Sequence, residues 1–307
     1  MLDALRRSPK PIAPAGPWID RPDALDLLAT LKATTAVKAA ARDLIVDGFT
    51  ILRQAIAKDL CAQVVEDYRR FARDNPEIVA FDAHGRERRL LQFHQVSDSS
   101  MRVATDAGVM SVLDFIFGRR TSPYSSLTFK YGTQQELHRD TPHFATWPRN
   151  QFVGAWTALE DIHQDAGPLH YVQGGHRYRL EPEDILRHVQ ARHGHLTTAE
   201  LIDKALWRYN DQVELHAAKH GVLTIADRMK CGDVAIWHAQ LPHGGSPAAD
   251  PSRSRWSMVV HCTPEGVQGH EYPTFFTHRE SEPPADRYQY REAYGRKIAY
   301  IGDPVFG

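Results

Sequence analysis

The feature that most constrains the fold is a change in hydrophobic spacing near residue 124. Up to about residue 118, apolar residues recur mainly at helical spacing, most clearly over residues 57–73. One face of that segment carries Leu60, Val64, Tyr68 and Phe71. From Tyr124 onward, short strand-like segments are separated by Gly, Pro and Asp turns. Because strands and helices do not alternate regularly, we expect an antiparallel sandwich or jelly roll supported by helices.

The expected organisation is a single, mainly β domain that spans residues 1–307. The strand candidates of its core are residues 125–131, 151–159, 168–173, 222–226, 233–239 and 255–262. Helical spacing over residues 182–220 interrupts the series and predicts a helical insertion between strands. The parts are an extended arm (1–21), a mostly helical support (22–118), the β core (124–262) and a C-terminal tail (263–307).

Composition and charge exclude several classes of function. Hydrophobic residues make up 42% and charged residues 24%, which is ordinary for a soluble globular protein. Lys+Arg number 37 and Asp+Glu 38, so no global positive field attracts nucleic acid or anionic lipid. No run of about 18 apolar residues predicts a membrane span. Together these features predict no nucleic-acid or membrane partner. The three cysteines lack CxxC spacing, so we expect a reducing, cytoplasmic location.

The strongest chemical signal lies in residues 136–144, which contain His138 and Asp140 two positions apart. On an extended segment, such side chains point to the same side. An imidazole and a carboxylate there can take adjacent positions on a metal ion, with a third ligand from elsewhere. The pattern is weak alone, because a chain with 17 histidines can contain an HxD pair by chance. The sequence has no phosphate-binding glycine motif, so nucleotide binding is not supported.

Two later segments strengthen this signal. Residues 231–247 predict a turn, a strand and then His243 in a turn with Gly244 and Gly245, where the backbone can approach a ligand closely. Residues 252–261 begin a strand with Arg255 and Ser257 on one side, and an arginine there can bind a carboxylate through two nitrogens. The alternative is that the arginines of this segment are solvated loop cations.

With these segments in view, the chain resembles the phytanoyl-CoA dioxygenase family of Fe(II)/2-oxoglutarate oxygenases. The resemblance runs in order over roughly residues 45–262. It is carried by four stretches: His138-Arg139-Asp140, residues 156–161 (WTALED), residues 166–176 (AGPLHYVQGGH), and Gly232-Asp233 through His243. Residues 47–52, followed by a helix, also fit the family's usual opening.

The resemblance implies a double-stranded β-helix (cupin-like jelly roll) with helices outside it. It implies that His138, Asp140 and His243 bind Fe(II), and that Trp156, Arg255 and Ser257 bind the cosubstrate 2-oxoglutarate. The implied activity is oxidation by O2, most simply hydroxylation, of a small-molecule metabolite with release of succinate and CO2. A carboxylate at Asp140 favours hydroxylation, desaturation or ring closure over halogenation.

Two departures from the family pattern leave questions open. Ser254 stands where the family usually has its arginine, and Arg253 and Arg255 flank it on one face of the strand. We favour Arg255 because Ser257 completes the R-x-S pair. Residues 173–176 (QGGH) replace the usual PGSH in a turn that is mostly structural.

Two other functions remain as alternatives at this point. The same His/Asp/His site would suit a Zn-dependent hydrolase, or the chain is a non-catalytic metabolite-binding member of the fold. Substrate contacts are expected from residues 75–100, 141–150, 182–220 and 265–290, including Arg89 and His143. His238 is expected to pack on the opposite face. Whether His270 and His278 fold over the site stays open. The substrate, the roles of His143 and the insertion, and the oligomeric state stay open.

Overall fold

The computed structural model describes residues 16–225, 229–270, 272–277 and 288–307. The first part is helical, as expected, and forms α1 (Ala24–Thr30), α2 (Thr35–Val46), α3 (Lys58–Asp74), α4 (Asp98–Ala104) and α5 (Ala107–Phe117). Within the expected helical support, residues 24–46 form two helices, α1 and α2. The Thr34 hydroxyl accepts a hydrogen bond from the Val37 amide at 3.3 Å and so begins a new helix.

A seven-stranded antiparallel sheet forms one wall of the molecule. Its strands are β1 (Phe49–Leu52), β2 (Leu90–Leu91), β3 (Thr121–Phe129), β5 (Val153–Ala158), β8 (Val234–His238), β10 (Ser257–Pro264) and β14 (Val305–Phe306). Their order across the sheet is β1-β8-β5-β10-β3-β2-β14. Strand β3 begins before the expected residue 125, and β10 begins and ends slightly later than expected.

A smaller sheet of three strands, in the order β7-β6-β9, forms the second wall. Its strands are β6 (Leu169–Gln173), β7 (Val222–Ile225) and β9 (His243–Gly245). The two sheets share an apolar layer that includes Trp156 and Val259 from the large sheet and Leu169 from the small one. The Phe49 ring of β1 also stacks on the Tyr171 ring of β6 at 4.6 Å. The two walls therefore make the expected double-stranded β-helix.

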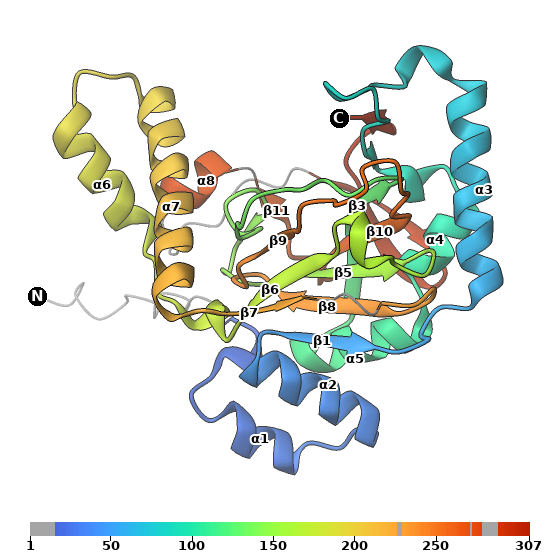
Figure 1. Cartoon of the computed structure of the whole chain (residues 1–307). Helices are drawn as coiled ribbons and strands as arrows, with labels where there is room; N and C mark the ends of the chain where they lie inside the picture. The colour runs from blue at the N-terminus through green and yellow to red at the C-terminus, as the bar shows by residue number, and fades with distance from the viewer. Residues whose placement is uncertain (1–15, 226–228, 271, 278–287) are drawn as a thin grey trace, which may run out of the picture.

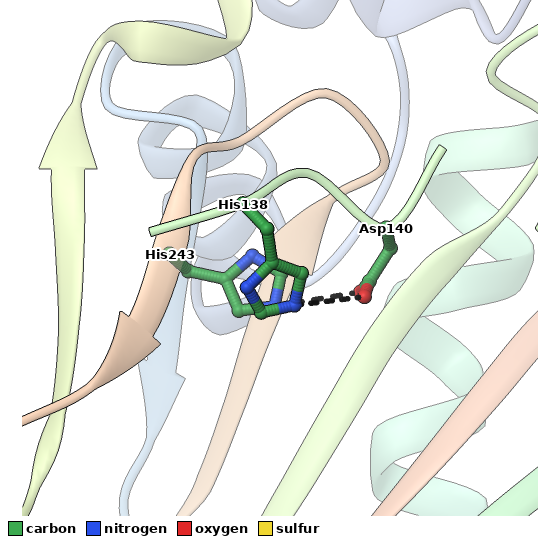
Figure 2. A group of neighbouring side chains, drawn as sticks. All are labelled: His138, Asp140 and His243. Carbon is green, nitrogen blue, oxygen red and sulfur yellow. Dashed lines mark ion pairs between the residues drawn. The ribbon is translucent and has the colours of Figure 1, made fainter. Parts of the chain in front are cut away.

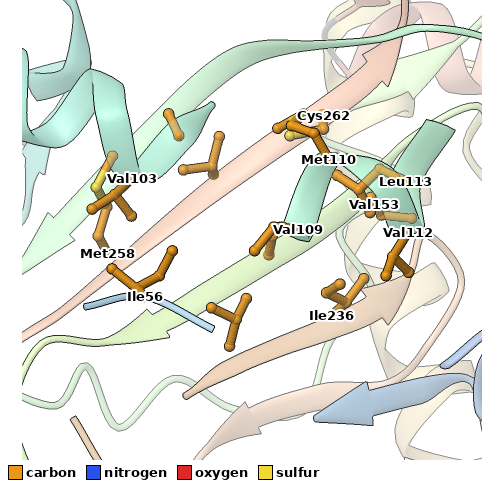
Figure 3. Close-up of a cluster of buried hydrophobic side chains, with 14 of the residues drawn as sticks. Ile56, Val103, Val109, Met110, Val112, Leu113, Val153, Ile236, Met258 and Cys262 are labelled. Carbon is orange, nitrogen blue, oxygen red and sulfur yellow. The ribbon is translucent and has the colours of Figure 1, made fainter. Parts of the chain in front are cut away.

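Alternation along the central strands separates a structural face from a chemical face. Met258, Val260 and Cys262 of β10 belong to the buried cluster that packs under the N-terminal helices. Val259 and His261 point to the opposite side and line a cavity between the sheets. Figure 3 shows α4 and α5 side chains meeting the outward-facing residues of β5, β8 and β10.

The helical insertion lies between β6 and β7, as expected, and consists of α6 (Pro182–His193) and α7 (Thr198–His220). These helices share an apolar cluster with α8 (Tyr272–Thr277), and the three stand together beside the barrel (Figure 1). The tail forms the hairpin of β12 (Gln289–Ala293) and β13 (Arg296–Tyr300). Strands β4 (Ala145–Thr146) and β11 (Gly269–His270) form a short pair.

The arm expected over residues 1–21 lies mostly outside the described residues, as does His278. Among the helices that are described, none combines the length and the apolar character needed to cross a bilayer. The cysteines Cys61, Cys231 and Cys262 are free thiols.

We predict that Ile236→Ala destabilises the protein by about 2–5 kcal/mol, because it leaves a cavity between β8 and the helices. Ile236 is fully buried in the cluster drawn in Figure 3. The free energy of unfolding in urea measures the loss. Leu215→Ala on the exposed face of α7 is the control and should change it little, because Leu215 is 61% exposed. Equal effects of the two substitutions would contradict this assignment of the core.

Candidate metal centre and cavity

Two residues far apart in the sequence are joined by their backbones at the end of the small sheet. The His138 amide donates to the His243 carbonyl at 2.9 Å, and the His243 amide donates to the His138 carbonyl at 2.9 Å. This antiparallel bridge brings the loop that carries His138 against β9, so the two imidazoles lie together with ring centroids 4.5 Å apart (Figure 2).

The glycine after His243 permits this close approach. A Cβ on Gly244 would lie 2.7 Å from His170 Nε2 and 2.8 Å from the Gln135 carbonyl oxygen. Such distances are too short for a side chain, so any other residue would push residues 134–136 away from β9. Gly244 therefore allows the close backbone approach expected from the sequence, and the segment that approaches it is the one that leads into His138.

His138, Asp140 and His243 form a group whose ligand atoms all lie within 4.8 Å of one another. Nδ1–H of His138 faces the Glu136 carbonyl at 2.8 Å, and Nδ1–H of His243 faces the Leu241 carbonyl at 2.9 Å. These carbonyls fix the tautomer in which each Nε2 carries a lone pair and no proton. The Gln135 side-chain amide donates to Nε2 of His138 at 3.1 Å. Burial and the nearby His243 lower the pKa of His138 to about 4, so His138 is neutral near pH 7.

The Asp140 carboxylate completes the group and is held from behind. Its oxygens lie 3.7 Å from His138 Nε2 and 3.6 Å from His243 Nε2. Trp237 donates its indole N–H to Asp140 Oδ2 at 2.8 Å. Burial alone would raise the pKa of Asp140, but His243, His261 and His138 hold it well below the usual range. The carboxylate is therefore ionised and oriented.

The Trp237 ring itself depends on a glycine in the neighbouring strand. Gly154 of β5 pairs with Trp237 of β8, and a Cβ on Gly154 would lie 2.4 Å from the indole ring. A side chain at position 154 would thus displace the group that orients Asp140.

Arg139, between the two ligand candidates, points away from them into the protein. It is almost fully buried and donates to the Gly175 carbonyl at 2.8 Å and the Tyr178 carbonyl at 2.7 Å. It also contacts the Tyr209 hydroxyl of α7 at 3.3 Å. The insertion is therefore attached behind the His/Asp/His group, and none of its described residues lines the cavity in front of that group.

The group opens into a cavity of about 400 Å³ between the sheets. Trp156 and Arg255 line it, and the Arg255 guanidinium lies 5.8 Å from the centre of the Trp156 ring. Arg255 is 2% exposed and donates to the Gly167 carbonyl at 2.7 Å, while its Nε has no hydrogen-bond partner. Burial lowers the pKa of Arg255 to about 10, which still leaves it charged at neutral pH.

The two arginines that flank Ser254 have different surroundings. Arg253 is largely exposed and pairs with Asp250 at 3.2 Å, whereas Arg255 faces the cavity. Ser257 is buried, and its hydroxyl donates to the Arg255 carbonyl at 3.2 Å. Ser257 is not among the described residues that line the cavity, so its observed contact is to the backbone of Arg255.

Sequence reasoning missed the roles of Trp237 and His261. His261 of β10 is 2% exposed, stacks on Phe144 at 4.0 Å and places Nε2 3.6 Å from Asp140 Oδ2. Both residues lie on the inward-facing positions of predicted strands. Their alternate positions in the strands could have indicated that they face the site. Their contact with Asp140 could not be foreseen, because it depends on which strands pair.

The other histidines named from the sequence have separate surroundings. His143 and His270 line the cavity. His238 faces away from it, and its Nε2 lies 2.8 Å from Asp20 Oδ1.

Fold and site together define an oxygenase-type enzyme of the two-histidine-one-carboxylate class. The chain matches the profile of the family "Phytanoyl-CoA dioxygenase (PhyH)" over residues 45–255 and belongs to that family. No protein with a curated description matches the sequence.

Solved structures share the fold at low sequence identity. EctD from S. alaskensis, solved with 2-oxoglutarate and 5-hydroxyectoine, is 18% identical, with a TM-score of 0.59 over 95% of this chain and 96% of that one. The α-ketoglutarate-dependent epimerase SnoN from nogalamycin biosynthesis is 15% identical, with a TM-score of 0.58 over 86% and 98%. The α-ketoglutarate-dependent carbocyclase SnoK from the same biosynthesis is also 15% identical, with a TM-score of 0.58 over 80% and 88%.

We predict that Trp237→Phe weakens metal binding by about 10–100-fold, because the Asp140 carboxylate loses the donor that orients it. The affinity is measured by calorimetric titration with Co(II). Trp207→Phe on α7 is the matched control, since Trp207 is 72% exposed and distant from the cavity lining. Unchanged affinity in a folded Trp237→Phe protein would show that the indole does not position the ligand.

Proposed function

We propose that this protein is an Fe(II)- and 2-oxoglutarate-dependent dioxygenase that hydroxylates a small-molecule substrate. The observation that carries the proposal is the pairing of two features in one cavity. His138, Asp140 and His243 present two imidazole nitrogens and one carboxylate. Arg255 is a buried cation in that cavity with no carboxylate partner among the described residues.

The donor set fits Fe(II). Two nitrogens and one carboxylate on one side of an ion leave further coordination positions toward the cavity, which an oxygenase needs for its cosubstrate and O2. When bound, the iron and 2-oxoglutarate together supply activation of O2 coupled to oxidative decarboxylation to succinate and CO2. SnoN has been solved with Fe3+ and α-ketoglutarate, and EctD with bound Fe, which supports the same assignment for this fold.

The chain's own residues supply positioning. Arg255 binds the distal carboxylate of 2-oxoglutarate, because a buried unpaired guanidinium gains most from an anion. Ser257 holds the backbone of Arg255, and the Trp156 ring packs against the same guanidinium. The side chains of Leu169 and Val259 give the cavity apolar walls that exclude water from the reacting groups.

We predict that Arg255→Gln weakens 2-oxoglutarate binding at least about tenfold, because charge-assisted hydrogen bonds are lost in a buried site. The measurement is the visible charge-transfer absorption of the anaerobic Fe(II) protein as 2-oxoglutarate is added. Arg253→Gln is the matched control and should bind like the wild type, since Arg253 pairs with Asp250 in solvent. The reverse result would assign the cosubstrate to Arg253.

We predict that His138→Ala and Asp140→Ala each abolish succinate formation while the protein stays folded, because each removes one of three metal ligands. Succinate is followed with Fe(II), 2-oxoglutarate and a metabolite panel, and the oxidised product is identified by mass. A zinc hydrolase would release no succinate. A non-catalytic binder would show neither succinate nor uncoupled turnover. The proposal is contradicted if the wild type forms no succinate, or if either variant still forms it.

A further inference from the structure

A second cation lines the cavity and has no role in the function proposed above. Arg89 lies directly before β2, which is held between β3 and β14 in the large sheet. Its carbonyl accepts a hydrogen bond from the Gly307 amide at 3.1 Å, and the next residue, Leu90, is fully buried. The backbone of Arg89 is thus fixed, and its half-buried side chain faces the same cavity as His138 and Asp140.

The Arg89 guanidinium is not neutralised locally. Its Nε is buried without a hydrogen-bond partner among the described residues. Two acidic side chains of the same segment pair with other cations, Glu87 with Lys130 at 2.6 Å and Asp82 with Arg86 at 2.8 Å. Asp140 acts on Arg89 through its charge, but its ion-pair contacts are to histidines. Holding an arginine in such surroundings costs free energy unless an anion binds it.

Arg89 and Arg255 occupy different electrostatic surroundings within the cavity. The charges that act on Arg89 are those of Asp140 and Arg88, and Arg89 in turn acts on His138 and His143. Arg255 instead lies with Trp156, Gly167 and Tyr171. Arg89 therefore belongs to the side of the cavity where the metal group and His143 lie.

That side also offers an apolar surface. Tyr124 stacks loosely on Tyr288 with ring centroids 6.3 Å apart, and Tyr124 also meets the edge of Phe144 at 5.9 Å. All three rings line the cavity. At about 400 Å³, the cavity is in the size range of sites that bind small molecules.

From these contacts we propose that Arg89 binds an anionic group of the substrate, a carboxylate or a phosphate, while the aromatic rings hold its apolar portion next to the metal group. This substrate class rests on the proposed oxygenase function. The planar guanidinium can donate two parallel hydrogen bonds to either anion. Because the backbone of Arg89 is fixed, such a contact would orient the substrate.

The experiment compares each anion with its neutral counterpart. The probes are 3-phenylpropionate and its amide, other carboxylates with their amides, and phenyl phosphate with phenol. Binding is measured by calorimetry to the protein loaded anaerobically with Fe(II) and 2-oxoglutarate, and again to the protein without either. In the wild type we expect at least one anion to bind about tenfold or more tightly than its counterpart, as a half-buried charged hydrogen bond implies.

The variant Arg89→Gln should reduce that preference to about twofold or less while 2-oxoglutarate binding stays intact. Arg88→Gln, at the exposed neighbouring residue, is the matched control and should keep the preference. The proposal is overturned if no anion is preferred, or if the preference survives in Arg89→Gln. It is also overturned if Arg89→Gln abolishes 2-oxoglutarate binding, since Arg89 would then hold the cosubstrate. An Arg89-dependent preference without any 2-oxoglutarate binding would keep the anion site and reject the oxygenase function.

Discussion

The reciprocal backbone hydrogen bonds between His138 and His243 are the constraint on which the site depends. They bring a loop that follows the large sheet against an edge of the small sheet, and so close the barrel at the point where the ligand candidates lie. Gly244 makes that approach possible, because any side chain there would meet Gln135. Backbone pairing thus holds both histidines in place before any metal is bound. This lowers the conformational-entropy cost of metal binding.

Around this bridge, the structure separates its charges instead of pairing them. Asp140 is ionised among three histidines, whereas Arg255 and Arg89 lie in the cavity without a carboxylate ion pair among the described residues. A buried cation that keeps its charge is costly in a folded chain. The near-zero net charge of the protein therefore coexists with two arginines in one cavity, which the proposed anionic ligands would neutralise.

The sequence was informative wherever chemistry is carried by spacing along one segment. The alternation within 233–239 and 255–262 predicted strands with two faces, which β8 and β10 form. The HxD pair and the His243 turn pointed to residues that the structure places together, His138, Asp140 and His243. Alternation alone could not separate Arg253 from Arg255, because both lie on one face of the strand, and only the R-x-S context favoured Arg255, which lines the cavity. The turn that pairs Arg253 with Asp250 separates them. Trp237 and His261 could not be assigned, since their contacts depend on strand pairing.

The insertion illustrates how a segment can serve a site without touching its ligands. Spacing predicted the helices of residues 182–220, and we expected them to contribute to the pocket. Instead, Tyr209 of α7 contacts Arg139, which also donates to the Gln240 side chain and to the carbonyls of Gly175 and Tyr178. Because Arg139 stands between two ligand candidates and points the opposite way, these contacts fix the direction in which His138 and Asp140 project. The insertion therefore supports the site from behind, on the side away from the cavity that Arg89 and the aromatic rings line.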